Sequence, residues 1–269
     1  MNNLPLLIEP EDLEQSASYD NVVIVDLSKP ATYLKLHVPG AVHLDYAPIV
    51  AANKPVMGLV PDDATLTSVF SGIGIDDDTH VIAYDDEGGG KAARLLWTLA
   101  VAGHDQASLL NGGLHAWANE GHKYDAEPVT STPRHFTVRR TDTVTADSHY
   151  INSHLDDKAY ALLDVRSPAE YSGAKKFAER AGHIPGAVNS EWTLAMDQSR
   201  NLRLKPDDEL LGMYDALGIT PAKEVITYCQ THHRSAHTWL VLKHLGFDKV
   251  KGYPGSWSDW GNNPELPVE

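Results

Sequence analysis

The chain has 269 residues, of which 42% are hydrophobic, and its formal net charge at pH 7 is −15. That length suits one large domain or two of ordinary size, and the acidic balance excludes nucleic acid and anionic membranes as main partners, because both need basic patches. The single cysteine excludes an internal disulfide, and no stretch approaches the roughly 20 apolar residues of a membrane span or the pattern of a signal peptide, so we expect a cytoplasmic protein.

The chain contains an internal repeat. Four segments recur in the same order: residues 25–33 match 163–171, residues 37–42 match 183–188, residues 81–85 match 225–229, and residues 111–117 match 254–260. Copies this long and varied indicate two domains of one kind rather than a solenoid array. We predict a first domain over residues 1–125, a linker rich in Pro, Thr and Ser over residues 126–142, and a second domain over residues 143–269.

Each copy alternates strand and helix patterns. In the second copy, strand patterns cover residues 160–165 and 225–228, and helix patterns cover residues 206–217 and 235–245. Gly218 and Gly246 follow the two helices, as glycines at helix C-termini do. This alternation predicts an α/β fold with two tandem domains, each a parallel sheet with helices on both faces.

Cys229 stands where the second of these strands gives way to a helix. A polar loop separates the two elements and consists of Gln230, Thr231, His232, His233, Arg234 and Ser235. A thiol at a helix N-terminus faces free N–H groups and the positive end of the helix dipole, which lower its pKa from about 8.5. Cys229 is therefore the predicted nucleophile, with a buried structural thiol as the alternative, and the N–H groups of the loop are predicted to hold its anion.

The first copy has Asp85 where the second has Cys229. A carboxylate cannot act as a sulfur nucleophile, so we expect the first domain to be catalytically inactive. The loop that follows, residues 86–91, is acidic and rich in glycine. Its neighbouring carboxylates argue against a phosphate cradle and favour a loop that keeps its turn and serves a domain interface. We also expect Asp85→Cys to create no activity, because this loop lacks the right length and charge.

The motifs of the second copy occur in a family-specific order. They are Asp164-x-Arg166-x-x-x-x-Tyr171, Gly182-His183-Ile184-Pro185-Gly186-Ala187, a strand ending at Cys229, and Gly255-Ser256-Trp257-x-x-Trp260. With their counterparts in the first copy they resemble the two-domain rhodaneses, which are thiosulfate sulfurtransferases, and the Cys-Gln-Thr-His-His-Arg loop is most similar to the Azotobacter type. The resemblance covers nearly the whole chain and implies an inactive first domain, a catalytic second domain and a cysteine persulfide intermediate.

The mechanism that the resemblance implies is covalent. The Cys229 thiolate takes the outer sulfur of a small anionic donor such as thiosulfate, and a thiophilic acceptor such as cyanide or a thiol then removes it. This chemistry needs no metal and no organic cofactor. A cysteine desulfurase or a sulfur-accepting protein is a further candidate partner.

Residues around Cys229 have expected supporting roles. Arg234 is expected to support the loop and attract anionic donors, and its alternative or additional role is an ion pair with Glu191 or Asp164. We expect Gln230, Thr231, His232 and His233 to act mainly through their backbone amides. Asp164 and Arg166 end a strand, where open α/β sheets place their sites, and are expected to brace the loop, although Asp26 at the matching position favours a turn-forming role for Asp164. Trp192 lines the site or serves packing alone.

Two alternatives remain open at this point. Better-known rhodaneses carry donor-binding cations where this chain has Glu170, Gln230 and Thr231. The natural donor can therefore be mercaptopyruvate or a protein-bound persulfide, which makes the chain a sulfur carrier for a partner. The minor alternative is a dual-specificity phosphatase of the cell-division-cycle kind, but the Cys-x4-Arg loop is one residue shorter than the loop of that class and suits one sulfur atom better than a phosphoryl group.

Overall fold

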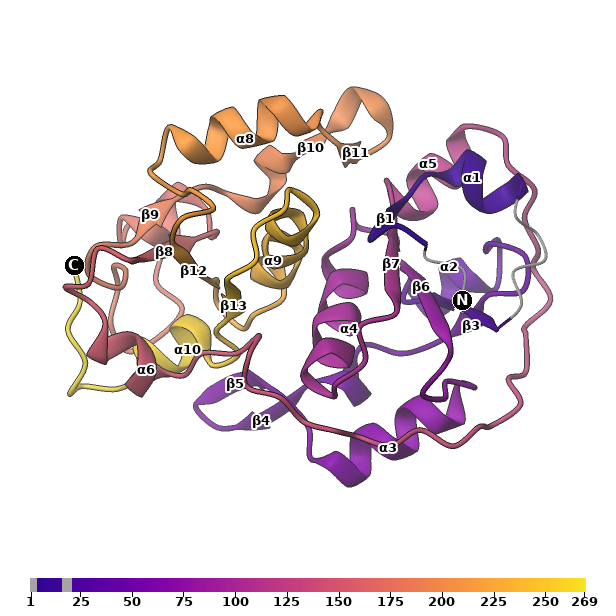
Figure 1. The fold of residues 1–269 in the computed structure, drawn as a ribbon, viewed down its shortest axis with the longest axis horizontal. Coiled ribbons are helices and arrows are strands. Elements are labelled where there is room, and N and C mark those ends of the chain that lie inside the picture. The colour runs from indigo at the N-terminus through magenta and orange to yellow at the C-terminus, as the bar shows by residue number, and fades with distance from the viewer. Residues whose placement is uncertain (1–3, 16–20) are drawn as a thin grey trace. The chain divides into compact units, whose positions relative to one another are not determined.

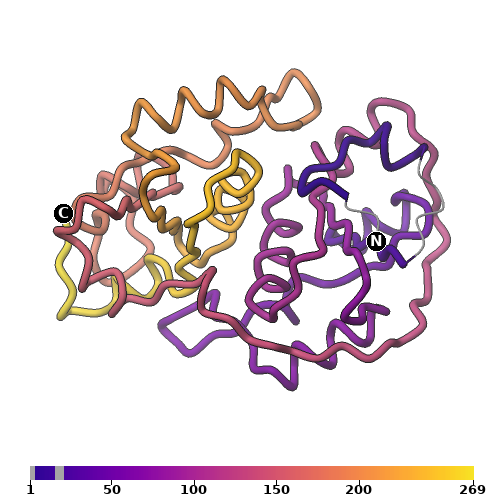
Figure 2. The backbone as a smooth tube through the Cα atoms, viewed as in Figure 1, coloured from indigo at the N-terminus to yellow at the C-terminus, as the bar shows by residue number. Residues whose placement is uncertain are grey.

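The protein is known from a computed structural model, which describes residues 4–15 and 21–269. The backbone forms two compact units (Figure 2). Unit 1 comprises Met1–Ile49, Pro61–Thr141 and Met196–Leu204, and unit 2 comprises Val50–Val60, Asp142–Ala195 and Lys205–Glu269. Each unit therefore contains a short segment that belongs, in the sequence, to the other copy.

Unit 1 is built on a parallel sheet whose strand order in the described residues is β1-β7-β6-β2-β3. Its strands are β1 (Leu7–Ile8), β2 (Val22–Asp26), β3 (Val42–His43), β6 (His80–Tyr84) and β7 (Ala107–Leu110), and the antiparallel pair β10 (Met196–Asp197) and β11 (Arg203–Leu204) completes the unit. Its helices are α1 (Pro10–Gln15), α2 (Pro30–Tyr33), η1 (Ala47–Ile49), α3 (Asp63–Gly72), α4 (Gly90–Val101), α5 (Gly113–Asn119) and η3 (Gln198–Arg200).

The β6 strand is buried on both faces, as expected for a central strand of a parallel sheet. On one face, Ile82 and Tyr84 pack in a cluster with Leu13 of α1 and with Leu114 and Trp117 of α5. The α4 helix, buried over nearly its whole length, contacts β6 and β7 (Figure 1). Alternate side chains of one strand thus pack toward different helices.

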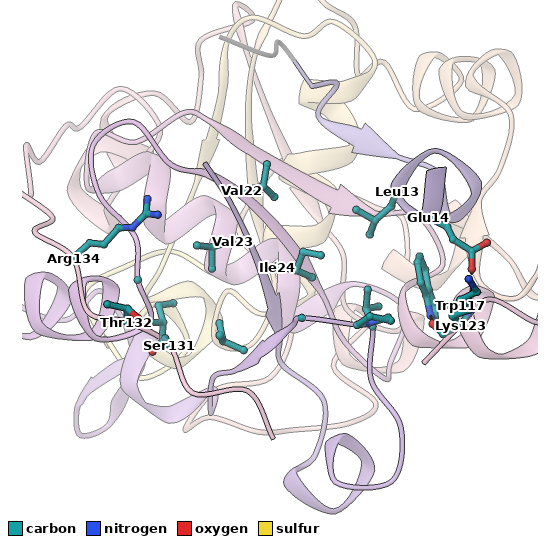
Figure 3. A pocket seen from close by; sticks show the side chains of 16 residues that line it. Leu13, Glu14, Val22, Val23, Ile24, Trp117, Lys123, Ser131, Thr132 and Arg134 are labelled. Atoms are coloured by element: carbon teal, nitrogen blue, oxygen red, sulfur yellow. Dashed lines mark hydrogen bonds between the residues drawn. The ribbon is translucent and has the colours of Figure 1, made fainter. Parts of the chain in front are cut away.

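Unit 1 also has a cavity of about 590 Å³ along β2 (Figure 3). Val22, Val23 and Ile24 contribute strand side chains to it, and Trp117 and Arg134 are among the other lining residues. None of the lining residues is a predicted site residue. The chemistry predicted from the sequence therefore does not involve this cavity.

Unit 2 is built on a parallel sheet with strand order β13-β12-β8-β9. Its strands are β8 (Tyr160–Asp164), β9 (Val188–Asn189), β12 (Glu224–Tyr228) and β13 (Val250–Gly252), and the antiparallel hairpin of β4 (Ala51–Asn53) and β5 (Val56–Leu59) completes the unit. Its helices are α6 (Ser148–Ser153), α7 (Pro168–Tyr171), η2 (Trp192–Ala195), α8 (Asp207–Asp215), α9 (Arg234–His244) and α10 (Ser256–Trp260).

The sequence patterns of unit 2 match its elements closely. The predicted helices correspond to α8 and α9, and Gly218 and Gly246 beyond them have φ angles of +72° and +83°. Ile226 and Tyr228 of β12 pack with α6 and α10 in one cluster, while α9 contacts β12 and β13 (Figure 1). The prediction of parallel sheets flanked by helices is confirmed.

The predicted linker, residues 126–142, contains no helix or strand. Phe136 of this segment is nevertheless buried, and its ring packs edge-on against Phe70 of α3, with ring centroids 5.2 Å apart. The segment therefore packs against unit 1. In the described part of the chain, no helix has the length and apolar character that crossing a membrane requires.

Candidate active site

Cys229 lies at the carboxyl end of β12, next to the end of β8. Tyr228 and Asp164 are paired in the ladder between these strands, so the residue after Tyr228 emerges at the strand edge where open α/β sheets place their sites. The α9 helix begins five residues later, at Arg234. Cys229 itself is buried. Burial of the thiol agrees with the alternative of a structural cysteine. Its place at a strand-to-helix junction agrees with the prediction of a nucleophile.

Ser256 holds the loop that follows Cys229. Its hydroxyl oxygen accepts hydrogen bonds from the backbone N–H groups of Cys229 (3.2 Å) and His232 (3.1 Å), and it donates to the carbonyl of Tyr253 (2.7 Å). Ser256 and His232 both have positive φ angles, +49° and +53°. Non-glycine residues in this region are strained, so the hydrogen bonds hold a tight loop that the backbone alone would not favour.

The environment of Cys229 favours the thiolate. Burial raises the thiol pKa, but the charge of Arg234, the hydroxyl of Ser235 and the N–H groups of Ser235 and Thr231 outweigh it and lower the pKa to about 7. His232 Nδ1 lies 2.7 Å from Ser235 Oγ. A proton on that nitrogen leaves the Ser235 hydroxyl hydrogen free for the sulfur. About half of the thiol is therefore ionised at neutral pH.

Arg234 forms a two-pronged ion pair with Glu170 of α7. Its guanidinium donates to the two carboxylate oxygens over 2.8 Å and 2.9 Å. Burial opposes ionisation of Glu170, but the Arg234 and Ser167 hydrogen bonds lower its pKa to about 2. The partner of Arg234 is thus Glu170, and the prediction of Glu191 or Asp164 is wrong. Asp164 instead forms an ion pair with Arg166, and Arg234 pairs with the carboxylate of Glu170.

Asp164 and Arg166 form a buried pair below the loop. The Arg166 guanidinium donates to Asp164 and to the Gly182 carbonyl (2.8 Å), and it lies over the ring of Trp257, 4.6 Å from the ring centroid. The backbone N–H of Trp257 in turn donates to the Cys229 carbonyl (3.0 Å). The pair therefore reaches the loop through Trp257.

The remaining predicted residues lie around the loop. The Gln230 side chain donates to the Phe177 carbonyl (3.2 Å). The Trp192 ring packs edge-on against His237 of α9, with centroids 5.3 Å apart, and lies 6.2 Å from the His233 ring. Glu191 precedes η2, where its carbonyl accepts from the Leu194 N–H (2.9 Å).

The first copy has a loop of the same length after Asp85, although Gly89 has a φ of +100° where the matching His233 has −92°. The backbone N–H groups of Glu87, Gly89, Lys91 and Ala92 donate to the Asp85 carboxylate over 2.8–3.0 Å. Burial raises the pKa of Asp85, and the amide hydrogen bonds partly offset that effect. The α4 helix begins at Gly90, five residues after Asp85. The prediction that this loop differs in length is therefore wrong, because both helices begin at the same spacing.

Glu170 and Ser256 are site residues that were not predicted from the sequence. Ser167 and Glu170 form a capping box at the start of α7, and this Ser-x-x-Glu pattern is readable in the sequence. Ser256 matches Gly113 in the repeat, and Gly113 has a similar φ of +54°. A serine where the other copy needs a glycine was the available signal, since strain of this kind persists where a side chain is needed.

The rhodanese-like domain profile matches residues 9–120 and 147–263, and the chain belongs to this family. It is 44% identical to a thiosulfate sulfurtransferase of Pseudomonas aeruginosa, covering 100% of this chain and 98% of that protein. It is also 44% identical to a thiosulfate sulfurtransferase of Azotobacter vinelandii, covering 99% and 98%. The predicted resemblance to tandem rhodaneses is confirmed.

One further relative and one solved structure are also similar to this chain. The sulfur carrier protein TtuD of Thermus thermophilus is 34% identical over 86% of this chain and 85% of that protein. A solved structure of EanB in complex with ergothioneine matches with a TM-score of 0.88 and 24% identity, covering 98% of this chain and 70% of that chain. At that identity the match shows the fold alone.

Proposed function

We propose that this protein is a thiosulfate sulfurtransferase that moves sulfane sulfur through a persulfide on Cys229. The observation that carries the proposal is the setting of Cys229: a strand-end thiol with a pKa of about 7, next to the Arg234 cation and the N–H groups of Thr231 and Ser235. Relatives named thiosulfate sulfurtransferase, at 44% identity over the full chain, support the same reaction.

The reaction has two balanced steps. The Cys229 thiolate attacks the outer sulfur of thiosulfate, a new S–S bond forms, and the old S–S bond breaks with its electron pair leaving on sulfite. The persulfide anion then gives its outer sulfur to cyanide or a thiol, which regenerates the Cys229 thiolate. With cyanide as the acceptor no proton is exchanged in either step, and each electron pair that forms a bond is matched by a pair that leaves with sulfite or returns to Cys229, so the proposed reaction uses no metal or organic cofactor.

The donors around Cys229 can hold an anion in both steps. The N–H groups of Thr231 and Ser235 and the Ser235 hydroxyl that stabilise the thiolate would stabilise the persulfide anion as well. Arg234 adds a positive charge, of which Glu170 neutralises a large part. Thiosulfate binding is therefore expected to be weak for an anion site.

We also propose that the protein is cytoplasmic, since a reducing compartment keeps a lone thiol free.

Intact mass spectrometry tests this proposal directly. Treatment with thiosulfate should add one sulfur atom to the protein, and cyanide should remove it with formation of thiocyanate. Mercaptopyruvate and a cysteine desulfurase serve as alternative donors. Faster loading by the desulfurase than by thiosulfate would identify a carrier, and release of phosphate from p-nitrophenyl phosphate without thiocyanate formation would overturn the proposal.

The variant Cys229→Ser is expected to lose all sulfur loading while its circular dichroism spectrum and melting temperature stay close to those of the wild type. A serine oxygen keeps the size of the side chain but is not ionised at neutral pH and forms no persulfide. Thiocyanate formation by this variant at the wild-type rate would place the chemistry elsewhere in the chain.

A further inference from the structure

The β4–β5 hairpin belongs to the first copy in the sequence but to unit 2 in the structure. In Figure 1 it lies beside α10, with which β5 makes contact. The backbone N–H of Met57 in β5 donates to the Ser258 hydroxyl of α10 (2.9 Å), and that hydroxyl lies 2.7 Å from the Gly255 carbonyl, to which it can donate. The hairpin therefore packs on α10, the helix whose Ser256 and Trp257 form hydrogen bonds with the backbone of Cys229.

Ser258 joins this hairpin to the catalytic loop. Its backbone N–H donates to the carbonyl of Gln230 over 3.0 Å. The side chain of one residue thus binds the hairpin, and its backbone binds the residue directly after Cys229. A displacement of β5 would reach the loop through this residue.

Gly58 of this hairpin lies directly against the backbone of Thr231 in the catalytic loop. Its φ angle is +75°, and a methyl group built on its Cα would overlap the Thr231 carbonyl oxygen and lie 2.7 Å from the Thr231 carbonyl carbon. Both atoms belong to backbone, which cannot rotate away as the end of a side chain can. Any residue larger than glycine at position 58 would therefore have to displace the Thr231 peptide or the hairpin.

Thr231 is one of the residues whose N–H groups stabilise the Cys229 thiolate. We propose that Gly58 is a positioning residue for sulfur transfer: by lacking a side chain it lets the hairpin lie against the carbonyl group and Cα of Thr231, and so fixes the residue whose own N–H faces the Cys229 sulfur. This inference rests on the function proposed above for Cys229. It assigns a role in the active site of unit 2 to a residue of the first sequence copy.

The corresponding hairpin of unit 1 makes the opposite contact. There the glycine, Gly88, belongs to the loop after Asp85, and a methyl group built on it would lie 2.6 Å from Met196 Sδ and 3.5 Å from a Leu202 methyl group. In unit 1 the hairpin therefore meets the loop with side chains, and in unit 2 it meets the loop with a bare backbone. Only the second arrangement fixes a peptide group beside a thiol.

The test compares Gly58→Ala with Gly186→Ala. Gly186 lies in the same unit and has a φ of +74°, but a methyl group built on it meets nothing within 4 Å. Both variants carry the same backbone strain, and only Gly58→Ala presses on Thr231. The readout is the Cys229 pKa, followed through the ultraviolet absorbance of the thiolate after subtraction of the same variant carrying Cys229→Ser.

In Gly58→Ala the pKa of Cys229 should rise by about one unit, the loss expected for one hydrogen bond to an anion. Sulfur loading from thiosulfate at pH 7 should slow about fivefold, because the ionised fraction falls from about half to about one tenth, and the two rates should converge at alkaline pH. Gly186→Ala should keep the wild-type pKa. A wild-type titration curve in folded Gly58→Ala would overturn the inference.

Ser258→Ala provides a second test that does not depend on the folding of Gly58→Ala. It removes the hydrogen bond that seats Met57, and it should raise the Cys229 pKa in the same direction by a smaller amount. A wild-type titration curve in Ser258→Ala would also count against the inference. Failure of the wild-type protein to take up sulfur would instead reject the proposed function, while the titrations would still decide the role of Gly58.

Discussion

The two loops that follow Asp85 and Cys229 have the same length but differ in the group that they surround and in backbone conformation, since Gly89 has a φ of +100° where the matching His233 has −92°. Each loop follows the central strand of a parallel sheet, and each helix begins five residues later. The N–H groups two and six residues after the key residue bind it in both loops: those of Glu87 and Lys91 donate to Asp85, and those of Thr231 and Ser235 face Cys229.

The difference between the two loops shows that similar sets of backbone N–H groups can surround either a carboxyl group or a thiol. In unit 1 the carboxyl group of Asp85 accepts hydrogen bonds from four backbone N–H groups and so fills the loop. In unit 2 the residue is a thiol that becomes an anion only near neutral pH and can carry a further sulfur atom. Arg234 opens α9 where Gly90 opens α4, so a cation accompanies the thiol and none stands at the matching position beside the carboxylate.

An exchange of Asp85 and Cys229 tests most strongly whether the surrounding loop, and not the thiol alone, determines sulfur loading. The double variant Asp85→Cys/Cys229→Asp should lose sulfur loading by at least about a thousandfold, as removal of a nucleophile does. The thiol in unit 1 would lie beside Asp86 and Glu87 and lack a matching arginine, and Met196 and Leu202 pack against the same loop at Gly88. Mass spectrometry after thiosulfate treatment measures the loading.

The single variant Asp85→Cys is the matched control for the exchange. It keeps Cys229 and should gain one sulfur atom only, at the wild-type rate. A second sulfur atom on this variant would show that the cradle geometry alone is sufficient for persulfide formation, and the charge and packing differences between the loops would then carry no weight.

The variant Asp85→Ala tests whether the carboxylate fills its cradle. It should lower the free energy of unfolding by about 2–4 kcal/mol, because four N–H groups, two of them in buried hydrogen bonds, lose their acceptor. Asp85→Asn keeps one oxygen acceptor and should lose less. Denaturant unfolding, followed by tryptophan fluorescence, measures both. An Asp85→Ala protein as stable as the wild type would show that these hydrogen bonds contribute nothing to the net stability.

The sequence was sufficient to predict the parts of this site that depend on local pattern. The repeat, the strand that ends at Tyr228, the helix that begins near Arg234 and the lone Cys229 all follow from spacing and residue type. The class of reaction was implied by the resemblance to two-domain rhodaneses, which rests on the order of the motifs in the two copies. Each of these features is encoded within a few residues of its own position.

The parts that escaped prediction depend on contacts between distant residues. Glu170 and Arg234 are 64 positions apart, and Met57 and Ser258 are 201 apart. Residues 50–60 and 196–204 each pack in the unit that is built mainly from the other sequence copy, and no local pattern in either segment predicts this. Charge and periodicity indicate which residues need a partner, but the tertiary fold decides which partner they receive.

Sulfur loading should depend on pH, because the residue at this position in unit 2 is a thiol that ionises near neutral pH. Because the pKa of Cys229 is about 7 and the thiolate is the reactive form, the loading rate should increase about tenfold from pH 6 to pH 8 and then level off. Rates of thiosulfate loading under single-turnover conditions measure this. A rate independent of pH over that range would show that the thiol is fully ionised throughout or that another step limits loading.

The smallest expected effect concerns the charge that Glu170 removes from Arg234. Glu170→Gln keeps the shape of the side chain and one acceptor for the guanidinium but leaves the Arg234 charge uncompensated beside Cys229. We expect the KM for thiosulfate to fall about threefold and the Cys229 pKa to fall slightly, since both the donor and the thiolate are anions. High salt should reduce the gain in KM, because screening weakens the attraction between Arg234 and a thiosulfate anion that approaches from solvent. The matched control is Glu209→Gln, which removes an exposed carboxylate paired with Lys205 in the same unit and should leave KM unchanged. An increase in KM for Glu170→Gln would mean that the carboxylate serves chiefly to position Arg234, and the comparison with Gly90 would then turn on geometry rather than on charge.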